Sequence, residues 1–362
     1  MPPASPRKRW PDVTRSRGRA LASDRLTYKD AGVDRETIAR SLGALSDQIR
    51  STFTPQVLGD LGQFSGLYHL RHYRDPVLVS TIDGVGTKAL LLREAGRLAV
   101  AGRDAIVHGV NDVAVLGATP LFALDYIAGA RLEAPEVTAL LEGMAAACRE
   151  EGLALIGGET AQMPGVYTAQ GLDVAACVVG VVERDELADG ARIKPGCLLI
   201  GLAASGLHTN GYSLAREIMA RRRWTLDTVP DELGAPLRDL LLAPHRSYRK
   251  PLLALATSQF LRGAAHITGG GIAANLVRVL PQGCRAVIDT RGWTVPRLFA
   301  VLANAGGIEA EEMLGTFNMG VGAIAVVPRE RGRLSVDICR ANGAEAWVIG
   351  EIVPGERGVE VR

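Results

Sequence analysis

Short apolar runs alternate along the chain with stretches in which apolar residues recur about every three to four positions. The apolar runs predict β-strands at 77–82, 153–156, 175–182, 197–202 and 266–268. The stretches with helical spacing predict helices at 104–116, at 135–151, from about 212, and from about 272 to 280. Strands that alternate with helices indicate a mixed α/β fold.

Polar turn-forming residues mark the ends of these elements. Asp104 suits the N-cap of its helix, and the segments 83–86 and 157–159 read as loops that follow strands. The most polar connection is Asp189 to Gly196, and the strand and helix pattern starts again after it. We therefore place a domain boundary there. The predicted parts are a disordered basic arm (1–25), an N-terminal domain (26–190) and a C-terminal α/β domain (191–362).

Composition narrows the class of protein. Apolar residues make up 47% of the chain, and its net charge is only +2. The arm holds seven Arg or Lys against two Asp, so the rest of the chain is slightly acidic. This charge balance outside the arm does not support a protein that binds nucleic acid. The five cysteines are scattered and predict reduced core thiols. Apolar runs fall far short of the ~20 residues that span a bilayer. We expect a soluble, cytoplasmic protein with no nucleic-acid or membrane partner.

Two loops place small or hydroxyl-bearing residues immediately before a predicted helix, Ser205 to Gly211 and Thr268 to Gly271. Free backbone N–H groups and the positive end of the helix dipole favour an anion at such a position. Either loop can hold a phosphate, and the alternative is that its glycines only form a turn. Three consecutive glycines cost backbone entropy, and close approach of a ligand or another backbone is the usual compensation.

Three carboxylates, Asp83, Asp112 and Glu159, lie at or beside loops that follow apolar structure. Such oxygens can converge on Mg²⁺, with nucleotide phosphates completing its shell. The alternative is that each acid caps a helix or shapes a turn. Lys88 follows Asp83 in a glycine-containing segment, but Thr87 separates Gly86 from Lys88. The Walker phosphate loop requires adjacent Gly and Lys, so that fold is not implied.

Histidines supply the remaining candidate chemistry. Ser205 and His208 are close in sequence, but the Gly-x-Ser-x-Gly motif of serine hydrolases is absent. His108 and Asp112 lie one helical turn apart, either as a functional pair or through local packing. His208 and His266 each adjoin a predicted phosphate loop, and there ligand contact and a purely structural role stay open as alternatives.

Seven motifs follow one another between about residues 27 and 328. They are Tyr28–Asp34, Asp83–Lys88, Asn111–Asp112 with Gly117–Pro120, Gly157–Ala161 with Met163–Gly165, Ser205–Leu214, His266–Gly271 and Thr316–Gly322. In this order they resemble the phosphoribosylformylglycinamidine cyclo-ligases, also called aminoimidazole ribonucleotide synthetases. The number and order of the motifs make the resemblance specific.

The resemblance implies a two-domain ATP-dependent synthetase fold. Its N-terminal domain would pair with a second copy in a homodimer to form a β-barrel, beside an α/β C-terminal domain. It also implies ATP-dependent cyclisation of formylglycinamidine ribonucleotide to aminoimidazole ribonucleotide, ADP and phosphate in de novo purine biosynthesis. The cofactors would be ATP and Mg²⁺.

The resemblance carries roles over to particular residues of this sequence. It implies catalytic roles for Lys29, Lys88, His208 and His266. It implies ATP contacts from Asp30, Asp34, Gly84, Gly86, Thr87, Lys88, Asn111, Asp112 and Gly117. It implies substrate contacts from Glu159, Ser205, Gly206, His208, Asn210, Thr268, Gly269, Gly270 and Gly271. Asp83 and Asp112 would bind the metal.

Three positions depart from the family's usual pattern. Gln162 stands where Glu is common, Ala274 stands where an acid often follows the triple glycine, and His108 occupies a usually apolar position. Gln162 keeps hydrogen-bonding capacity but loses a charge, and Ala274 loses both. A paralogue with an altered substrate is therefore an alternative.

Two further classes compete with the cyclo-ligase. One is a sister ATP-using enzyme of the selenophosphate synthetase or thiamine-monophosphate kinase type, and the other is a non-catalytic dimeric binding protein. The first would show a reactive cysteine near the N-terminus if it were a selenophosphate synthetase, but the first cysteine is Cys148. The second would have lost Asp83, Lys88 and Asp112, which are present.

Overall fold

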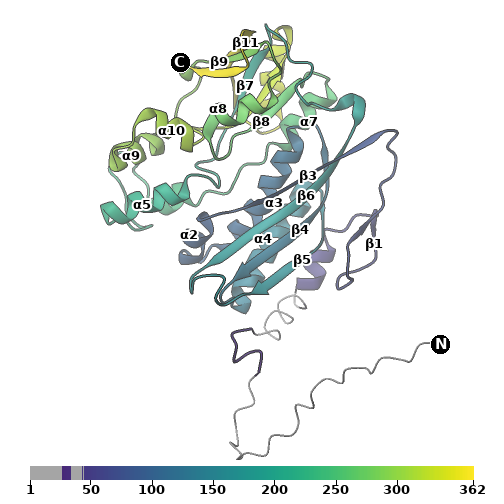
Figure 1. The fold of residues 1–362 in the computed structure, drawn as a ribbon, viewed down its shortest axis with the longest axis vertical. Coiled ribbons are helices and arrows are strands. Elements are labelled where there is room, and N and C mark those ends of the chain that lie inside the picture. Colours follow the sequence, from purple (N-terminus) through teal and green to yellow (C-terminus); the bar gives the residue numbers. More distant parts are fainter. Residues whose placement is uncertain (1–26, 34–42, 44) are drawn as a thin grey trace, which may run out of the picture.

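The computed structural model describes residues 27–33, 43 and 45–362. The basic arm predicted at 1–25 and the predicted ATP contact Asp34 lie outside the described residues. None of the described helices is long and apolar enough to cross a membrane. Figure 1 shows two sheets, each accompanied by helices, stacked along the longest axis of the molecule.

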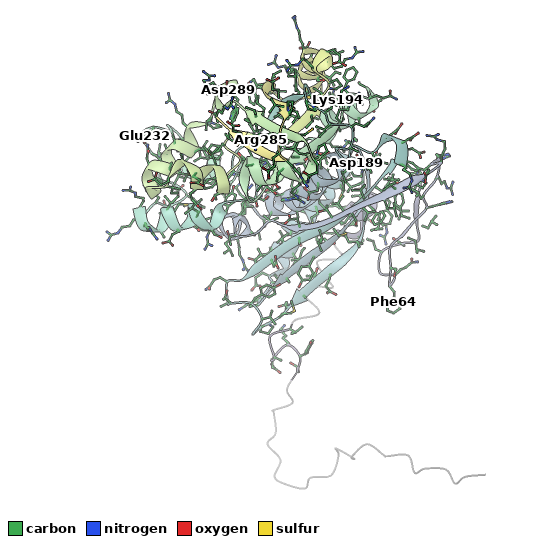
Figure 2. All side chains as sticks on the ribbon, turned by 45° about the horizontal axis from the view of Figure 1, so that its top comes forward. Phe64, Asp189, Lys194, Glu232, Arg285 and Asp289 are labelled. Atoms are coloured by element: carbon green, nitrogen blue, oxygen red, sulfur yellow. The ribbon has the colours of Figure 1, made fainter. Side chains whose placement is uncertain are left out.

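The N-terminal half is built on a four-stranded sheet in the order β3-β6-β4-β5. Its strands are β3 (Pro76–Gly84), β4 (Thr119–Gly129), β5 (Ala154–Gln162) and β6 (Leu172–Glu183). Its helices are α2 (Lys88–Glu94), α3 (Leu98–Ala114) and α4 (Ala134–Glu151). A small pair, β1 (Val57–Leu58) with β2 (Leu67–Tyr68), lies beside this sheet, and Phe64 projects from the loop that joins the pair (Figure 2).

Helices α3 and α4 cover one face of this sheet (Figure 1). Residues along β6 alternate between buried and partly exposed, as expected for a strand with one covered face. The two helices approach closely because Gly102 and Gly143 face each other's helix. A Cβ atom at either glycine would collide with the backbone of Leu140 or Ala99. The opposite face of the sheet exposes apolar side chains, Leu78 and Ile82 among them.

The C-terminal half is built on a six-stranded sheet in the order β12-β9-β11-β7-β10-β8. Its strands are β7 (Leu198–Ala203), β8 (Gly263–His266), β9 (Cys284–Ile288), β10 (Val321–Val327), β11 (Ala346–Pro354) and β12 (Gly358–Val361). Its helices are α5 (Tyr212–Arg222), α6 (Leu237–Leu241), α7 (Arg249–Thr257), α8 (Gly271–Leu276), α9 (Arg297–Gly306), α10 (Ala310–Thr316) and α11 (Gly332–Ala341). Short 3-10 turns occur at Arg184–Glu186, Val277–Val279, Thr290–Gly292 and Arg329–Arg331.

Packing joins the two halves. Every residue of β10 is buried, and the residues on its two faces belong to two separate apolar clusters. A third and larger cluster runs from α3 and α4 into α5 and α9. The loops between the two sheets are therefore held by a continuous apolar core, which fixes their relative positions.

The predicted mixed α/β class is confirmed, but three local predictions were wrong. The helix begins at Leu98, so Asp104 is not its N-cap and is instead a fully buried residue of its interior. Asp83 and Gly84 belong to β3, and 157–159 belong to β5, because both segments continue the ladders of their neighbouring strands. A glycine-containing segment is thus a strand wherever a neighbouring strand pairs with it.

Candidate active site

Loops that are distant in sequence meet above α3, between the two sheets. The Thr87 hydroxyl lies 3.2 Å from the Ser213 hydroxyl, which joins the segment after β3 to the start of α5. A Cβ atom at Gly269 would lie 3.2 Å from Asn210 Oδ1, so the two predicted phosphate loops are neighbours. The structure therefore brings the glycine segments of both halves to one place.

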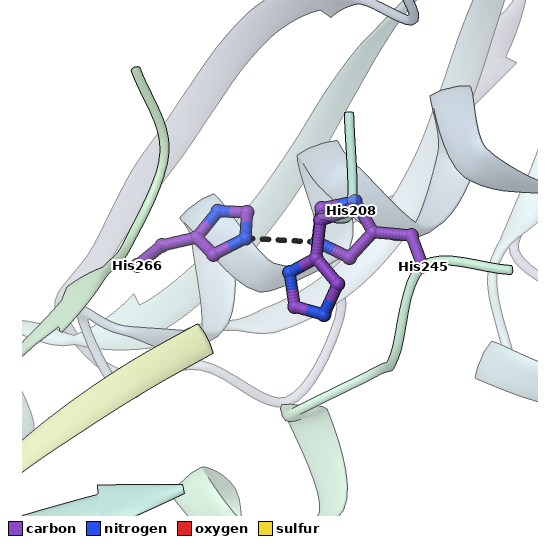
Figure 3. A group of neighbouring side chains, drawn as sticks. All are labelled: His208, His245 and His266. Carbon is purple, nitrogen blue, oxygen red and sulfur yellow. Dashed lines mark hydrogen bonds between the residues drawn. The ribbon is translucent and has the colours of Figure 1, made fainter. Parts of the chain in front are cut away.

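Four histidines form the centre of this region. His108 comes from α3, His208 from the loop before α5, His245 from the segment before α7, and His266 from the end of β8. None is more than 6% exposed. His245 Nε2 lies 3.0 Å from His266 Nε2, and the His208 ring stacks on His245 with 4.0 Å between centroids (Figure 3). The cluster places eight ring nitrogens in a nearly dry environment, where their protonation depends on neighbouring charges.

Two carboxylates border the histidine cluster. His266 Nδ1 donates to Asp112 Oδ1 over 2.8 Å, and the Thr81 hydroxyl donates to Asp112 Oδ2 over 3.0 Å. Asp83 and Thr81 lie on the face of β3 turned toward α3, because side chains two apart share a face. His108 Nε2 lies 3.0 Å from Asp83 Oδ2 and 3.9 Å from Asp112 Oδ2. His108 Nε2 therefore lies between the two carboxylates, although it forms no hydrogen bond with either of them.

These contacts divide the histidines by charge. Burial disfavours the charged form of His108, but Asp83 and Asp112 outweigh burial and raise the pKa of its ring. Burial lowers the pKa of His266 despite its hydrogen bond to Asp112, and burial lowers the pKa of the other two rings further. The pKa of Asp83 is lowered chiefly by its contact with His108. The pKa of Asp112 is lowered because His266 and His108 outweigh its burial. The site thus places two carboxylates beside His108, whose charged form they favour, and beside three imidazoles whose neutral form is favoured by burial.

His208 is held in an unusual backbone conformation. Its φ of 61° lies in the left-handed region, which costs energy for a residue with a side chain. Its Nε2 accepts from the Ser205 backbone N–H over 3.2 Å. Gly322 of β10 leaves room for the ring, since a Cβ there would collide with His208 and Tyr248. The loop is strained so that this imidazole faces the cluster.

Lys88 is enclosed by protein rather than directed at a cavity. Its Nζ lies 2.6 Å from Asp104 Oδ2, with both side chains fully buried, and it also donates to the Ala243 carbonyl over 2.6 Å. The other oxygen, Asp104 Oδ1, accepts from the His245 backbone N–H over 2.8 Å. The pair therefore fixes the segment that carries His245. The predicted contact of Lys88 with ATP remains a prediction, and it requires this pair to separate.

Other predicted residues hold the same segment. Asn111 Nδ2 donates to the Arg246 carbonyl over 2.9 Å, and Asn111 Oδ1 accepts from the Tyr248 N–H over 2.7 Å. The Ser205 hydroxyl donates to the Pro244 carbonyl over 2.6 Å. These contacts position the chain from 243 to 248 against α3 and the loop before α5.

Sequence reasoning missed three residues of this region: Asp104, His245 and Tyr248. Asp104 was interpreted as a helix cap. His245 lies in a segment without a recognisable motif, and its place in the cluster depends on contacts with α3. The only available signal was the accumulation of polar residues between 244 and 249 in an otherwise apolar stretch.

Glu159 lies apart from the histidine cluster. Across the sheet, Asp83 pairs with Ala176, which pairs with Asp125, which pairs with Gly158. Three strand spacings of ~4.8 Å place Glu159 roughly 14 Å from Asp83. Exposed Glu159 lines a separate cavity of about 880 Å³ between β4, β5 and residues 60–66. The predicted substrate contact by Glu159 therefore does not share the histidine site in this chain.

Asp125 is the unexpected ionisable group of that cavity. Burial raises its pKa to about 7, and the charge of Glu159 acts in the same direction. Gly158 accommodates the carboxyl group, since a Cβ there would collide with it. Asp125 is thus poised to exchange a proton near neutral pH.

Replacing Asp125 with Asn should stabilise the protein at high pH. The pKa of Asp125 rises from 3.8 to about 7 on folding, so its contribution to stability falls as pH increases through that interval. Asn carries no such dependence. We expect the advantage of Asp125→Asn to grow by about 1 to 3 kcal/mol between about pH 5 and about pH 8. Urea unfolding of both proteins across that range measures it, and a difference independent of pH would contradict the expectation.

The remaining predicted residues occupy turns and glycine segments. Asp30 accepts from the Thr27 N–H and hydroxyl in an exposed turn that also holds Lys29. Gly84 donates its N–H to Asp83 Oδ1. The Gly206 carbonyl accepts from Asn318 Nδ2. Left-handed backbone occurs at Gly86, Gly117, Gly206, Gly270 and Gly271. The two other departures from the family pattern are Gln162, buried at the end of β5, and Ala274, in α8 beside Gly270.

Both halves of the chain match known protein domains. Residues 66–182 match the N-terminal domain, and residues 194–362 the C-terminal domain, of the family described as AIR synthase related protein. Thiamine-monophosphate kinase from Stenotrophomonas maltophilia K279a has a TM-score of 0.65 at 18% identity, covering 88% of this chain and 95% of its own. The hydrogenase maturation protein HypE in complex with ATP has a TM-score of 0.65 at 17% identity, covering 92% and 93%. At these identities the two structures show the shared fold alone.

Relatives of higher identity bear one name. A phosphoribosylformylglycinamidine cyclo-ligase from Geotalea daltonii is 44% identical over 346 residues, which is 94% of this chain and 99% of the relative. One from Anaeromyxobacter dehalogenans (strain 2CP-1) is 45% identical over 342 residues, which is 93% and 99%. The chain therefore belongs to the phosphoribosylformylglycinamidine cyclo-ligase family.

Proposed function

We propose that this chain catalyses the ATP-dependent cyclisation of formylglycinamidine ribonucleotide to aminoimidazole ribonucleotide, with release of ADP and phosphate, in de novo purine biosynthesis. The observation that carries the proposal is that identity to the named relatives spans both halves, while the motif residues of both halves meet at one histidine cluster. The sister kinases and synthetases are less favoured, because the solved thiamine-monophosphate kinase shares the fold at low identity.

The reaction requires activation of the formyl oxygen. Hydroxide is a poor leaving group, whereas phosphate leaves readily. Transfer of the terminal phosphoryl group of ATP to that oxygen breaks one P–O bond of ATP and forms another. The amidine nitrogen then attacks the formyl carbon, the C–O bond breaks, and the nitrogen loses a proton. A neutral imidazole held by a carboxylate, as His266 is by Asp112, suits acceptance of that proton.

Asp83 and Asp112 fit the proposed Mg²⁺ site. Their side chains are 50% and 26% exposed, so water and phosphate oxygens can reach them, while His108 Nε2 lies within 3.9 Å of both carboxylates. Mg²⁺ favours carboxylate oxygens and retains several waters and phosphate ligands. When bound, it would neutralise charge on the ATP phosphates. The two carboxylates would orient the transferring group, and Lys88, once separated from Asp104, would offset its charge.

We place the phosphate of the ribotide at one of the two neighbouring glycine loops, Ser205 to Gly211 or Thr268 to Gly271. Backbone N–H groups would hold it. The loop before α5 precedes the longer of the two helices, which spans 11 residues. Gly269 lies beside Asn210, so either placement keeps the phosphate near His208 and His266.

Gly270→Val tests this placement. A branched side chain would block close approach of the ligand to the loop, so KM for the ribotide should rise more than KM for ATP. Steady-state kinetics with each substrate varied in turn measure the two constants. Gly283→Val is the matched control, because Gly283 also has a positive φ but no atom lies near its Cβ position. A rise in KM for ATP alone would mean that ATP, and not the ribotide, binds at this loop.

A homodimer and a cytoplasmic location complete the proposal. The face of the sheet away from α3 and α4 exposes Leu78, Ile82 and Leu124, and the last two lie in one row across β3, β6 and β4. An uncovered apolar sheet face is typical of an interface. Sedimentation should therefore show a species of about twice the chain mass. An active monomer at micromolar concentration would contradict this expectation.

The overall reaction is tested by supplying the purified chain with ATP and formylglycinamidine ribonucleotide. Aminoimidazole ribonucleotide and ADP should appear in equal amounts. Parallel reactions with thiamine monophosphate and with selenide should yield no product. Turnover of either of those substrates in place of the ribotide would favour the sister-enzyme alternative.

A further inference from the structure

His108 stands where the carboxylates of Asp83 and Asp112 come together. Its Nε2 lies 3.0 Å from Asp83 Oδ2 and 3.9 Å from Asp112 Oδ2. The side chain is only 2% exposed, and Nε2 is buried without a hydrogen-bond partner among the described residues. A buried ring nitrogen that faces two anions requires a cation between them, either a proton or a metal ion.

The contact made by the other ring nitrogen, Nδ1, determines whether Nε2 carries a proton or a lone pair. His108 Nδ1 lies 2.9 Å from the Thr209 hydroxyl, which comes from the loop before α5. When Nδ1 donates its proton to that hydroxyl, Nε2 carries a lone pair directed at the carboxylates. Histidines that bind metals are held in this way, with the second nitrogen donating to a protein acceptor.

A similar second layer holds Asp112. His266 Nδ1 donates to its Oδ1 and the Thr81 hydroxyl donates to its Oδ2. Ligand atoms of His108, Asp112 and His266 all lie within 4.8 Å of one another. The Asp112 carboxylate and the His108 ring thus have fixed directions before any ion arrives, and half-exposed Asp83 completes the site from β3.

We propose that His108 completes a mixed nitrogen and oxygen site with Asp83 and Asp112 that takes a divalent transition ion such as Mn²⁺ in preference to Mg²⁺. The proposal rests on the function proposed above for the two carboxylates. Mg²⁺ favours oxygen ligands, whereas an imidazole nitrogen favours the transition ions.

The test measures ion binding directly. The full-length protein, freed of metal, is titrated with Mn²⁺ while the resonance of free Mn²⁺ is followed, and bound Mn²⁺ is then displaced with Mg²⁺. We expect Mn²⁺ to bind at least about tenfold more tightly than Mg²⁺, because the ring nitrogen adds a ligand only for the former. His108→Val should lower Mn²⁺ affinity at least about tenfold and leave Mg²⁺ affinity unchanged. Exposed, remote His69→Ala is the control and should change neither.

A second variant keeps the test decisive if His108→Val does not fold. Thr209→Val removes the acceptor of the Nδ1 proton but leaves the ring in place, so it should weaken Mn²⁺ alone by about tenfold. Thermal melting of each metal-free variant verifies folding. Equal affinities of the folded variants and the parent for Mn²⁺ would overturn the role of His108.

Asp83→Asn separates this inference from the function on which it rests. If it weakens both ions while His108→Val weakens neither, the carboxylate site stands and the nitrogen ligand fails. If Asp83→Asn leaves both affinities unchanged, the ion binds elsewhere, and the proposed metal site fails together with the inference.

Discussion

Asp83→Asn and Asp112→Asn should each lower kcat by roughly 10²- to 10³-fold without unfolding the protein. Asn keeps the size of the side chain and most of its hydrogen bonds, including acceptance from His266 or from Thr81 at position 112. It removes the charge that a metal needs. Phosphoryl transfer depends on positioning and charge stabilisation, so the loss should fall on turnover.

Initial rates at saturating ATP and ribotide, measured across a range of Mg²⁺ concentrations, test this prediction. Asp75→Asn is a matched control, because Asp75 lies next to β3 but at its other end, where it pairs with Arg184. Near-normal turnover and unchanged Mg²⁺ dependence in both variants would mean that the metal site lies elsewhere. Loss of activity together with loss of the folded state would leave Asp112 a structural role and contradict the catalytic one.

Lys88→Met should destabilise the protein by about 3 to 5 kcal/mol. The ammonium group and the Asp104 carboxylate are both fully buried, 2.6 Å apart. Removing one partner leaves the other as an unpaired buried charge, and it also loosens the segment fixed by Asp104 and the Ala243 carbonyl. Urea unfolding of the parent and the variant gives the difference directly. A loss below about 1 kcal/mol would show that the pair contributes little.

The double variant Lys88→Met with Asp104→Asn separates structure from catalysis. Asn can still accept from the His245 N–H and leaves no unpaired charge, so most of the lost stability should return. The proposed role of Lys88 in offsetting charge on the transferring phosphoryl group predicts that turnover should nevertheless stay far below that of the parent. Normal turnover in a stable double variant would assign Lys88 to the fold alone.

The sequence predicted the main elements because their patterns are local. Alternation in β6 and helical spacing in α4 depend on residues within a few positions. The start of α3 was missed because no side chain caps it, and Asp104 resembled a cap. Asp104 instead pairs with Lys88 of α2, and no local sequence pattern predicts a pairing between two separate helices. Residues 157–159 were interpreted as a loop because their pairing with β4 is a tertiary contact.

The candidate site was predictable in its parts but not in its assembly. Asp83, Asp112, His208 and His266 were found because glycine-containing motifs surround them, and the structure brings them together through contacts with His108 and His245. His245 was not found, because backbone contacts from α3 place it there. Glu159 was grouped with these residues by motif, but sheet order places it three strands away from Asp83.

Phosphoryl transfer to the formyl oxygen, as proposed, requires that oxygen to leave the substrate with phosphate. Substrate carrying a heavy oxygen isotope in the formyl group tests this most directly, with the released phosphate analysed by mass spectrometry. We expect the label to pass from substrate to phosphate, with one labelled oxygen for each aminoimidazole ribonucleotide formed. Label that appears in water, with unlabelled phosphate, would contradict it.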